Sequence, residues 1–191
     1  MATSETPRGR LDLRAAVWAG IIAGMIFMML EMVLVFMFMG QSPWGPPRMI
    51  AAILLGKEVL PPPDTFDEGI MAVAMVVHFP LSVAYAILLA ALMPGAGRGA
   101  TVWGGAVFGL ILYLVNFYLF TGIFPWFAMA RNWVSVFNHI MFGLVAGWAY
   151  ASLRRPVLAG VAARAREVGG WDGVNRRYPG GVWSGPERRR A

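Results

Sequence analysis

The chain has 191 residues, of which 58% are hydrophobic and 14% charged, and its mean hydropathy is +0.61. These values lie outside the usual range of soluble domains and indicate an integral membrane protein. The chain has no cysteine, which excludes disulfides, thiolate zinc sites, iron–sulfur clusters and cysteine nucleophiles. The patterns of serine hydrolases, zinc proteases and nucleotide-binding loops are also missing, so the sequence does not favour an enzyme.

Four apolar runs each approach the ~20 residues that a helix needs to cross the hydrocarbon of a bilayer. They cover residues 15–39, 66–92, 101–120 and 134–153. Backbone groups in lipid must pair within their own segment, and these runs lack the alternation of barrel strands. We therefore expect an all-α fold, a transmembrane bundle of four helices.

The basic residues are divided unevenly between the two sides of this bundle. Thirteen of the sixteen lysines and arginines fall on one side, in the N-terminal segment 1–14, the second loop and the segment 154–191. The positive-inside rule then places both termini in the cytoplasm. The expected location is the bacterial inner membrane.

The first outer loop, 41–64, holds a short apolar segment between two proline clusters. This segment, Arg48 to Leu60, is too short to span and predicts an interfacial or re-entrant helix. The second span is expected to begin at a capping box, with Thr65 as the N-cap and Glu68 three residues later.

The C-terminal segment 154–191 differs in composition from the rest of the chain. It has nine arginines and three acids and accounts for the whole net charge of +6. Such a segment buries too little apolar surface to fold alone, so we expect a disordered tail that lies on anionic lipids. Binding of RNA through arginine and aromatic side chains is the less favoured alternative.

The first and third runs share the pattern W-x-G-x3-G-x6, which ends at Glu31 in one and at Asn116 in the other. The second and fourth runs each carry one histidine, His78 and His139. Two related hairpins with pseudo-twofold symmetry are predicted, and a chance match is the alternative. Small residues four apart mark faces where membrane helices approach closely, here Gly20, Gly24, Gly105, Gly109, Gly143 and Gly147.

The polar residues of the four runs are expected at one level, ~6 to 12 Å inside the outer boundary of the membrane. They are Glu31, His78, Asn116 and His139. A charge at the centre of a spanning helix costs ~3 kcal/mol on insertion scales, which makes this polar layer a candidate site.

Three interpretations of the polar layer stay open. In the first, Glu31 pairs with an imidazolium of His78 or His139, Asn116 and Asn138 complete the hydrogen bonds, and the layer only stabilises a structural or accessory subunit. In the second, the layer handles protons or cations, because histidine titrates near neutrality and two imidazoles with a carboxylate could hold a divalent metal. In the third, the two histidines ligate a b-type haem. No cofactor is the simplest expectation, and a second copy or another membrane subunit is the expected partner.

Aromatic and polar residues also gather at the outer rim. An aromatic belt at the water interface is the simplest interpretation. The alternative is a lipid or quinone headgroup site, closed by Arg131 and the first outer loop. The rim residues are Trp44, Arg48, Trp126, Arg131, Asn132 and Trp133.

The motifs SPWGPPRMIAAILLGKEVLPPP and NFYLFTGIFPWFAMARNW, with the helix that carries His78, resemble a group of short bacterial four-span proteins. Some of these proteins carry the label sodium:proline symporter, although their function is uncharacterised. The resemblance covers residues 15–153 and implies the four-span fold. Sodium:solute symporters have many more spans and discontinuous helices, so the resemblance does not imply symport.

Overall fold

The computed structural model describes residues 11–60 and 62–154, which form helices and loops without a strand. Four helical segments are long and apolar enough to cross a membrane: α1 (Leu13–Met39), α3 (Glu68–Leu92), α4 (Arg98–Leu114) with its continuation to Gly122, and α5 (Trp133–Leu153). The expected all-α membrane fold is thereby confirmed. The predicted tail, apart from Arg154, and most of the segment 1–14 lie outside the described residues.

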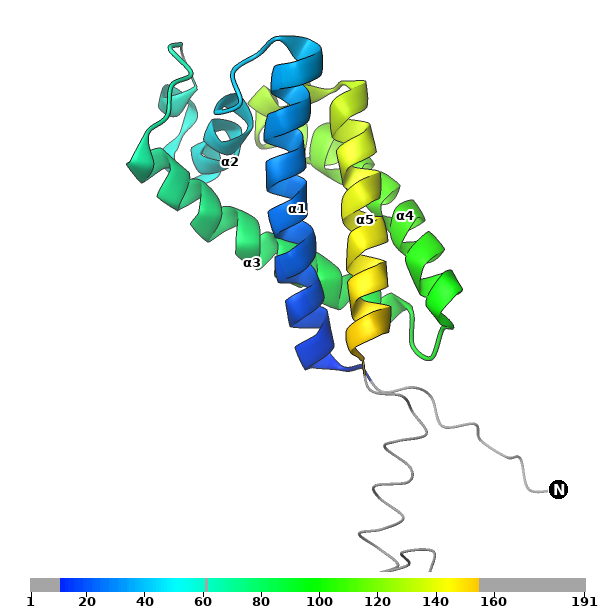
Figure 1. The fold of residues 1–191 in the computed structure, drawn as a ribbon. Helices are drawn as coiled ribbons and strands as arrows, with labels where there is room; N and C mark the ends of the chain where they lie inside the picture. The colour runs from blue at the N-terminus through cyan, green and yellow to red at the C-terminus, as the bar shows by residue number, and fades with distance from the viewer. Residues whose placement is uncertain (1–10, 61, 155–191) are drawn as a thin grey trace, which may run out of the picture. The chain divides into compact units, whose positions relative to one another are not determined.

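The long helices pack against one another in pairs. α1 lies against both α3 and α5, and α4 lies against α5. Toward the end that carries the loops 40–67 and 115–132, called the loop end, α3 leans away from the other helices (Figure 1). The short helix α2 (Gly45–Leu55) packs against α3 there. The divergence of α3 leaves room for a cavity within the helical unit.

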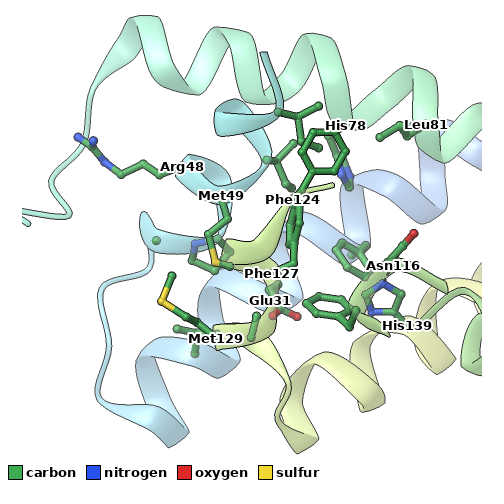
Figure 2. A pocket seen from close by; sticks show the side chains of 18 of the residues that line it. Glu31, Arg48, Met49, His78, Leu81, Asn116, Phe124, Phe127, Met129 and His139 are labelled. Atoms are coloured by element: carbon green, nitrogen blue, oxygen red, sulfur yellow. Dashed lines mark hydrogen bonds between the residues drawn. The ribbon is translucent and has the colours of Figure 1, made fainter. Parts of the chain in front are cut away.

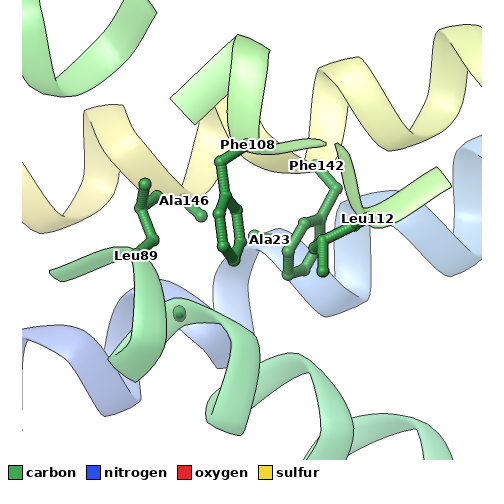
Figure 3. Close-up of a cluster of buried hydrophobic side chains, with 7 residues drawn as sticks. Ala23, Leu89, Phe108, Leu112, Phe142 and Ala146 are labelled. Atoms are coloured by element: carbon green, nitrogen blue, oxygen red, sulfur yellow. The ribbon is translucent and has the colours of Figure 1, made fainter. Parts of the chain in front are cut away.

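All four long helices contribute to one buried apolar cluster (Figure 3). Its small members are alanines, and its large members fill the space between the helix axes. Small residues allow close backbone approach, while the rings and leucines restore packing density. The cluster consists of Ala23, Ala86, Leu89, Phe108, Leu112, Phe142 and Ala146.

Glycines bring the helix backbones into direct contact. A methyl group added to Gly105 would meet the carbonyl of Gly143, and one added to Gly109 would meet the carbonyl of His139. A methyl group on Gly20 would lie 2.6 Å from the Cα of Val83. The glycine faces named from the sequence therefore lie between α1 and α3 and between α4 and α5.

The start of α3 differs from the predicted capping box. The N-cap is Asp67, whose carboxylate accepts a hydrogen bond from the Ile70 N–H at 2.8 Å, and Glu68 is the first helical residue. Thr65 lies before the helix, where its carbonyl accepts hydrogen bonds from Arg48. The prediction of a Thr65 cap is wrong because Asp67, a residue type that caps helices more favourably than Thr, lies two residues closer to the apolar run.

The third span is not a regular helix to its end. α4 ends at Leu114 and continues as a π-helical turn, η2 (Val115–Leu119), and two 3₁₀ turns, η3 (Phe120–Gly122) and η4 (Pro125–Ala130). π-helical turns inside α-helices occur often at functional sites. Here the turn carries Asn116, one of the four residues of the polar layer.

The loop helix α2 occupies Gly45–Leu55, whereas the sequence predicted a helix between Arg48 and Leu60. Its two prolines stand in the first turn, where a missing N–H costs no hydrogen bond. Gly56 ends the helix with φ of 87°, a conformation that favours glycine. A 3₁₀ turn, η1 (Lys57–Val59), follows.

Candidate functional site

A cavity of about 670 Å³ lies in the wedge between α3 and the other long helices. Its walls come from α1, α3, η2 and α5, and α2 and η4 line it at the loop end (Figure 2). All four residues of the polar layer line this cavity: Glu31, His78, Asn116 and His139. The structure thus brings together, at one cavity, residues from four separate spans.

Glu31 is buried, with 7% of its surface exposed, and its carboxylate is held by two neutral donors on α5. The Ser135 hydroxyl donates to Oε1 at 3.0 Å, and the Asn138 amide donates to Oε2 at 2.7 Å. The same amide nitrogen donates to the Phe27 carbonyl at 3.0 Å. The Asn138 Oδ1 is buried without a hydrogen-bond partner.

His139, Asn116 and Tyr85 form a directed chain of hydrogen bonds across three helical segments. His139 Nδ1 donates to the Ser135 carbonyl at 2.8 Å, so in the neutral ring Nε2 is an acceptor. The Asn116 amide nitrogen lies 3.4 Å from that Nε2, and Asn116 Oδ1 accepts from the Tyr85 hydroxyl at 3.0 Å. This chain joins α5, η2 and α3 beside the cavity.

His78 contacts the backbone of α1. Its Nε2 lies 2.8 Å from the Gly24 carbonyl and donates to it, with the Ser82 hydroxyl 3.4 Å away. The Phe27 ring contacts both histidines, with ring centroids 5.7 Å from His78 and 5.0 Å from His139. The close approach of α1 and α3 at Gly24 makes the hydrogen bond of His78 possible.

The expected ion pair between Glu31 and a histidine is not present. Within the described ranges, the carboxylate has only the Ser135 and Asn138 partners, while His78 and His139 bind backbone carbonyls. Both imidazoles instead donate to backbone carbonyls, so the ion pair of the first interpretation does not form in this structure. Asn138 does complete the hydrogen bonds of Glu31, as predicted.

The positions of the possible ligand atoms are also relevant to the metal and haem interpretations. No group of three or more His, Asp or Glu side chains that could hold a metal forms in residues 11–60 and 62–154, so Glu31, His78 and His139 do not form the metal site that the second interpretation allowed. A bis-histidine haem needs a free nitrogen from each ring. Both ring nitrogens of His139 already have partners, which does not favour haem.

The rim residues mostly hold the loops in place. Arg48 donates to the carbonyls of Val59 and Thr65, and the indole N–H of Trp126 donates to the Met49 carbonyl of α2 at 3.0 Å. Arg48 lines the cavity, but Trp126 does not. These contacts fasten α2 and η4 to each other and to the start of α3.

The remaining rim residues also have structural partners. Arg131 donates to the Phe117 carbonyl and to Thr121, and its guanidinium lies 4.5 Å from the Tyr118 ring centroid. It does not line the cavity, so it does not close a headgroup site there. Asn132 lines the cavity and caps α5, while Trp44 and Trp133 make edge-to-face contacts with Phe66 and Phe38.

Ser135 and Tyr85 were not singled out from the sequence. Ser135 stands three residues before Asn138 and four before His139, which puts all three on one helix face. Tyr85 is seven residues after His78, again on the same face. The signal was present, but serine and tyrosine are common in membrane helices and only the packing of the helices shows which of them meet.

No protein-family model, curated protein or solved structure matches this chain. The cavity and its polar residues are therefore the features that indicate a function. Among them, Glu31 is the one acid buried within the spanning helices. The residues around Glu31 determine which chemistry the cavity can support.

Proposed function

We propose that this is an integral membrane protein that takes up and releases protons or cations at Glu31, beside the cavity. The observation that carries the proposal is the buried carboxylate, which has two neutral donors and no cationic partner among the described side chains. An ionised carboxylate in an apolar interior needs a compensating positive charge. Glu31 must therefore hold a proton or accompany a cation from the cavity.

The hydrogen bonds around Glu31 are compatible with both a protonated and an ionised carboxylate. A serine hydroxyl is both donor and acceptor, so Ser135 can donate to the ionised form and accept from the protonated form. Asn138 remains a donor in both forms, because its amide nitrogen also binds the Phe27 carbonyl.

Two further proposals concern the organisation of the chain. We place both termini in the cytoplasm of a bacterium and the loop end outside its inner membrane, as the distribution of basic residues favours. We also propose that the two hairpins are related. In support, Gly24 lies against the His78 helix at Ser82, and Gly109 lies against the backbone of His139.

The competing function is a structural or accessory subunit that has no proton or cation chemistry. It is favoured by the bonds from Ser135 and Asn138 to Glu31, because they join α5 to α1 in the middle of the bundle. In that case Glu31 would contribute to assembly alone. Removing the charge while keeping the hydrogen bonds separates the two functions.

Glu31→Gln is the experiment that tests the proposal. The new amide can donate to the Ser135 hydroxyl and accept from Asn138, so the fold should persist. We expect infrared difference spectra of the full chain in lipid to contain a pH-dependent signal from one protonated carboxyl group, absent in Glu31→Gln. The exposed Glu58 supplies the control, Glu58→Gln, which should retain the signal.

Two results would contradict this proposal. The first is a spectrum of the unmodified chain in which no buried carboxyl group responds to pH or to added cations. The second is a Glu31→Gln variant that differs from the unmodified chain only in assembly or thermal stability. Either result would favour the structural subunit.

A further inference from the structure

The size of the cavity sets the class of molecule that can enter it. Its volume of about 670 Å³ falls within the range of sites that enclose drug-sized ligands. It is far larger than a desolvated metal ion or a single water requires. Most of its lining is apolar, so the preferred occupant has a large apolar body.

Aromatic rings line the cavity from the polar layer to the loop end. The distance between ring centroids is 5.3 Å for Phe117 and His139, 5.8 Å for Phe117 and Phe127, and 6.4 Å for Phe124 and Phe127. In the view of Figure 2, Phe124 and Phe127 lie between His78 and Glu31. Ring faces carry negative charge density and attract cations, most strongly where water is excluded.

The charged side chains of the lining are two acids and one base. Glu31 lies among the long helices, while Asp64 and Arg48 belong to the loop end. The Arg48 guanidinium is directed to the carbonyls of Val59 and Thr65. The inner part of the cavity therefore has a carboxylate without a counter-charge from the described side chains.

We infer that the cavity binds an amphipathic organic monocation, of the quaternary ammonium or phosphonium class, with Glu31 as its counter-ion and the phenylalanine rings around its apolar groups. The inference rests on the proposed function and names its substrate class. A proton and the organic cation compensate the same carboxylate, so each excludes the other. Inorganic divalent cations are disfavoured, because no group of three or more His, Asp or Glu side chains that could hold a metal forms in the described residues.

Tetraphenylphosphonium is a suitable probe, because it is a permanent monocation surrounded by aromatic groups. We expect calorimetry on the purified full chain in mild detergent to give one binding site. The affinity should fall as the pH is lowered, and binding should release a proton, measured by comparing buffers of different ionisation enthalpy. Glu31→Gln should weaken binding about tenfold or more, whereas Glu58→Gln should leave it unchanged.

Two further measurements separate charge recognition from apolar burial. Triphenylphosphine oxide is a neutral molecule of similar shape, and we expect the chain to bind it more weakly and without dependence on Glu31. Phe127→Leu keeps an apolar residue at the half-buried position and should weaken the binding of tetraphenylphosphonium several-fold. Equal binding of the neutral and cationic probes, unchanged in Glu31→Gln, would overturn the inference.

The infrared experiment on Glu31 distinguishes failure of this inference from failure of the proposed function. A carboxyl signal that depends on pH, without binding of tetraphenylphosphonium, would leave proton handling in place and reject the organic cation. Absence of both would reject both. Binding that is lost in Glu31→Gln, with a fold unchanged by circular dichroism and thermal unfolding, would support both.

Discussion

Asn138 is fully buried, and its amide nitrogen donates to Glu31 on one side and to the Phe27 carbonyl on the other. Both partners belong to α1, so one side chain of α5 satisfies two acceptors of the neighbouring helix. Ser135 makes a single neutral contact with the same carboxylate. The two donors are therefore unequal, because Asn138 donates to two acceptors on α1 and Ser135 donates to one.

We expect Asn138→Ala to lower the free energy of unfolding in detergent by about 2 kcal/mol, because the buried Oε2 of Glu31 loses its donor and the Phe27 carbonyl loses its second one. Ser135→Ala should cost about 1 kcal/mol or less. Ser152→Ala is the control, since this exposed hydroxyl binds only the Trp148 carbonyl of its own helix. Equal losses for Asn138→Ala and Ser152→Ala would show that the Asn138 contacts do not contribute to stability.

At the scale of the element, α4 and α5 are joined by direct contact of their backbones. Gly105 faces Gly143, and Gly147 faces the carbonyl of Thr101. Without a hydrophobic driving force between helices in lipid, such packing is the main source of association. Because His139 lies beside Gly109 on this interface, the glycine contacts also position an imidazole at the cavity.

Gly105→Ala should destabilise the bundle by about 2 to 3 kcal/mol, because its methyl group meets backbone that can move only if the helices separate. Gly99→Ala in the same helix is the matched control. Nothing lies within 4 Å of the added methyl group there, and alanine favours a helix over glycine by about 1 kcal/mol. Thermal unfolding should rank Gly99→Ala above the unmodified chain and Gly105→Ala below it, and the reverse order would contradict the packing.

A second prediction concerns the hydrogen bond that attaches α2 to η4 beside the cavity. Trp126→Phe removes the N–H that donates to Met49 and should increase amide hydrogen exchange in residues 45–55. Trp133→Phe is the control, because Trp133 is exposed and its only described contact is the ring of Phe38. Equal exchange in the two variants would show that this hydrogen bond does not hold α2 in place.

For the whole molecule, the distribution of basic residues predicts which end of the bundle faces the cytoplasm, and labelling can test this orientation. The chain has no cysteine, so a single introduced thiol can be labelled without background. Glu58 at the loop end and Gly97 at the opposite end are both exposed. In intact cells, a maleimide that cannot cross membranes should label Glu58→Cys and not Gly97→Cys, and the opposite pattern would reverse the proposed orientation.

The sequence by itself determined the number and approximate limits of the spans, because hydropathy over ~20 residues is a local property. The sequence also indicated the polar layer and the glycine faces, since helical periodicity places Glu31 on the same face as Gly20 and Gly24. It did not predict the π-helical turn at Asn116, because tertiary contacts there outweigh the apolar pattern of the span.

The partners of the polar residues follow from the tertiary structure and not from the sequence pattern. Glu31 binds Ser135 and Asn138, more than a hundred residues away along the chain, and the histidines bind backbone carbonyls. The cavity likewise depends on the divergence of α3 and the position of α2. Hydropathy and periodicity define what each helix can present, whereas the pairing of buried polar atoms depends on helix crossings that no single segment encodes.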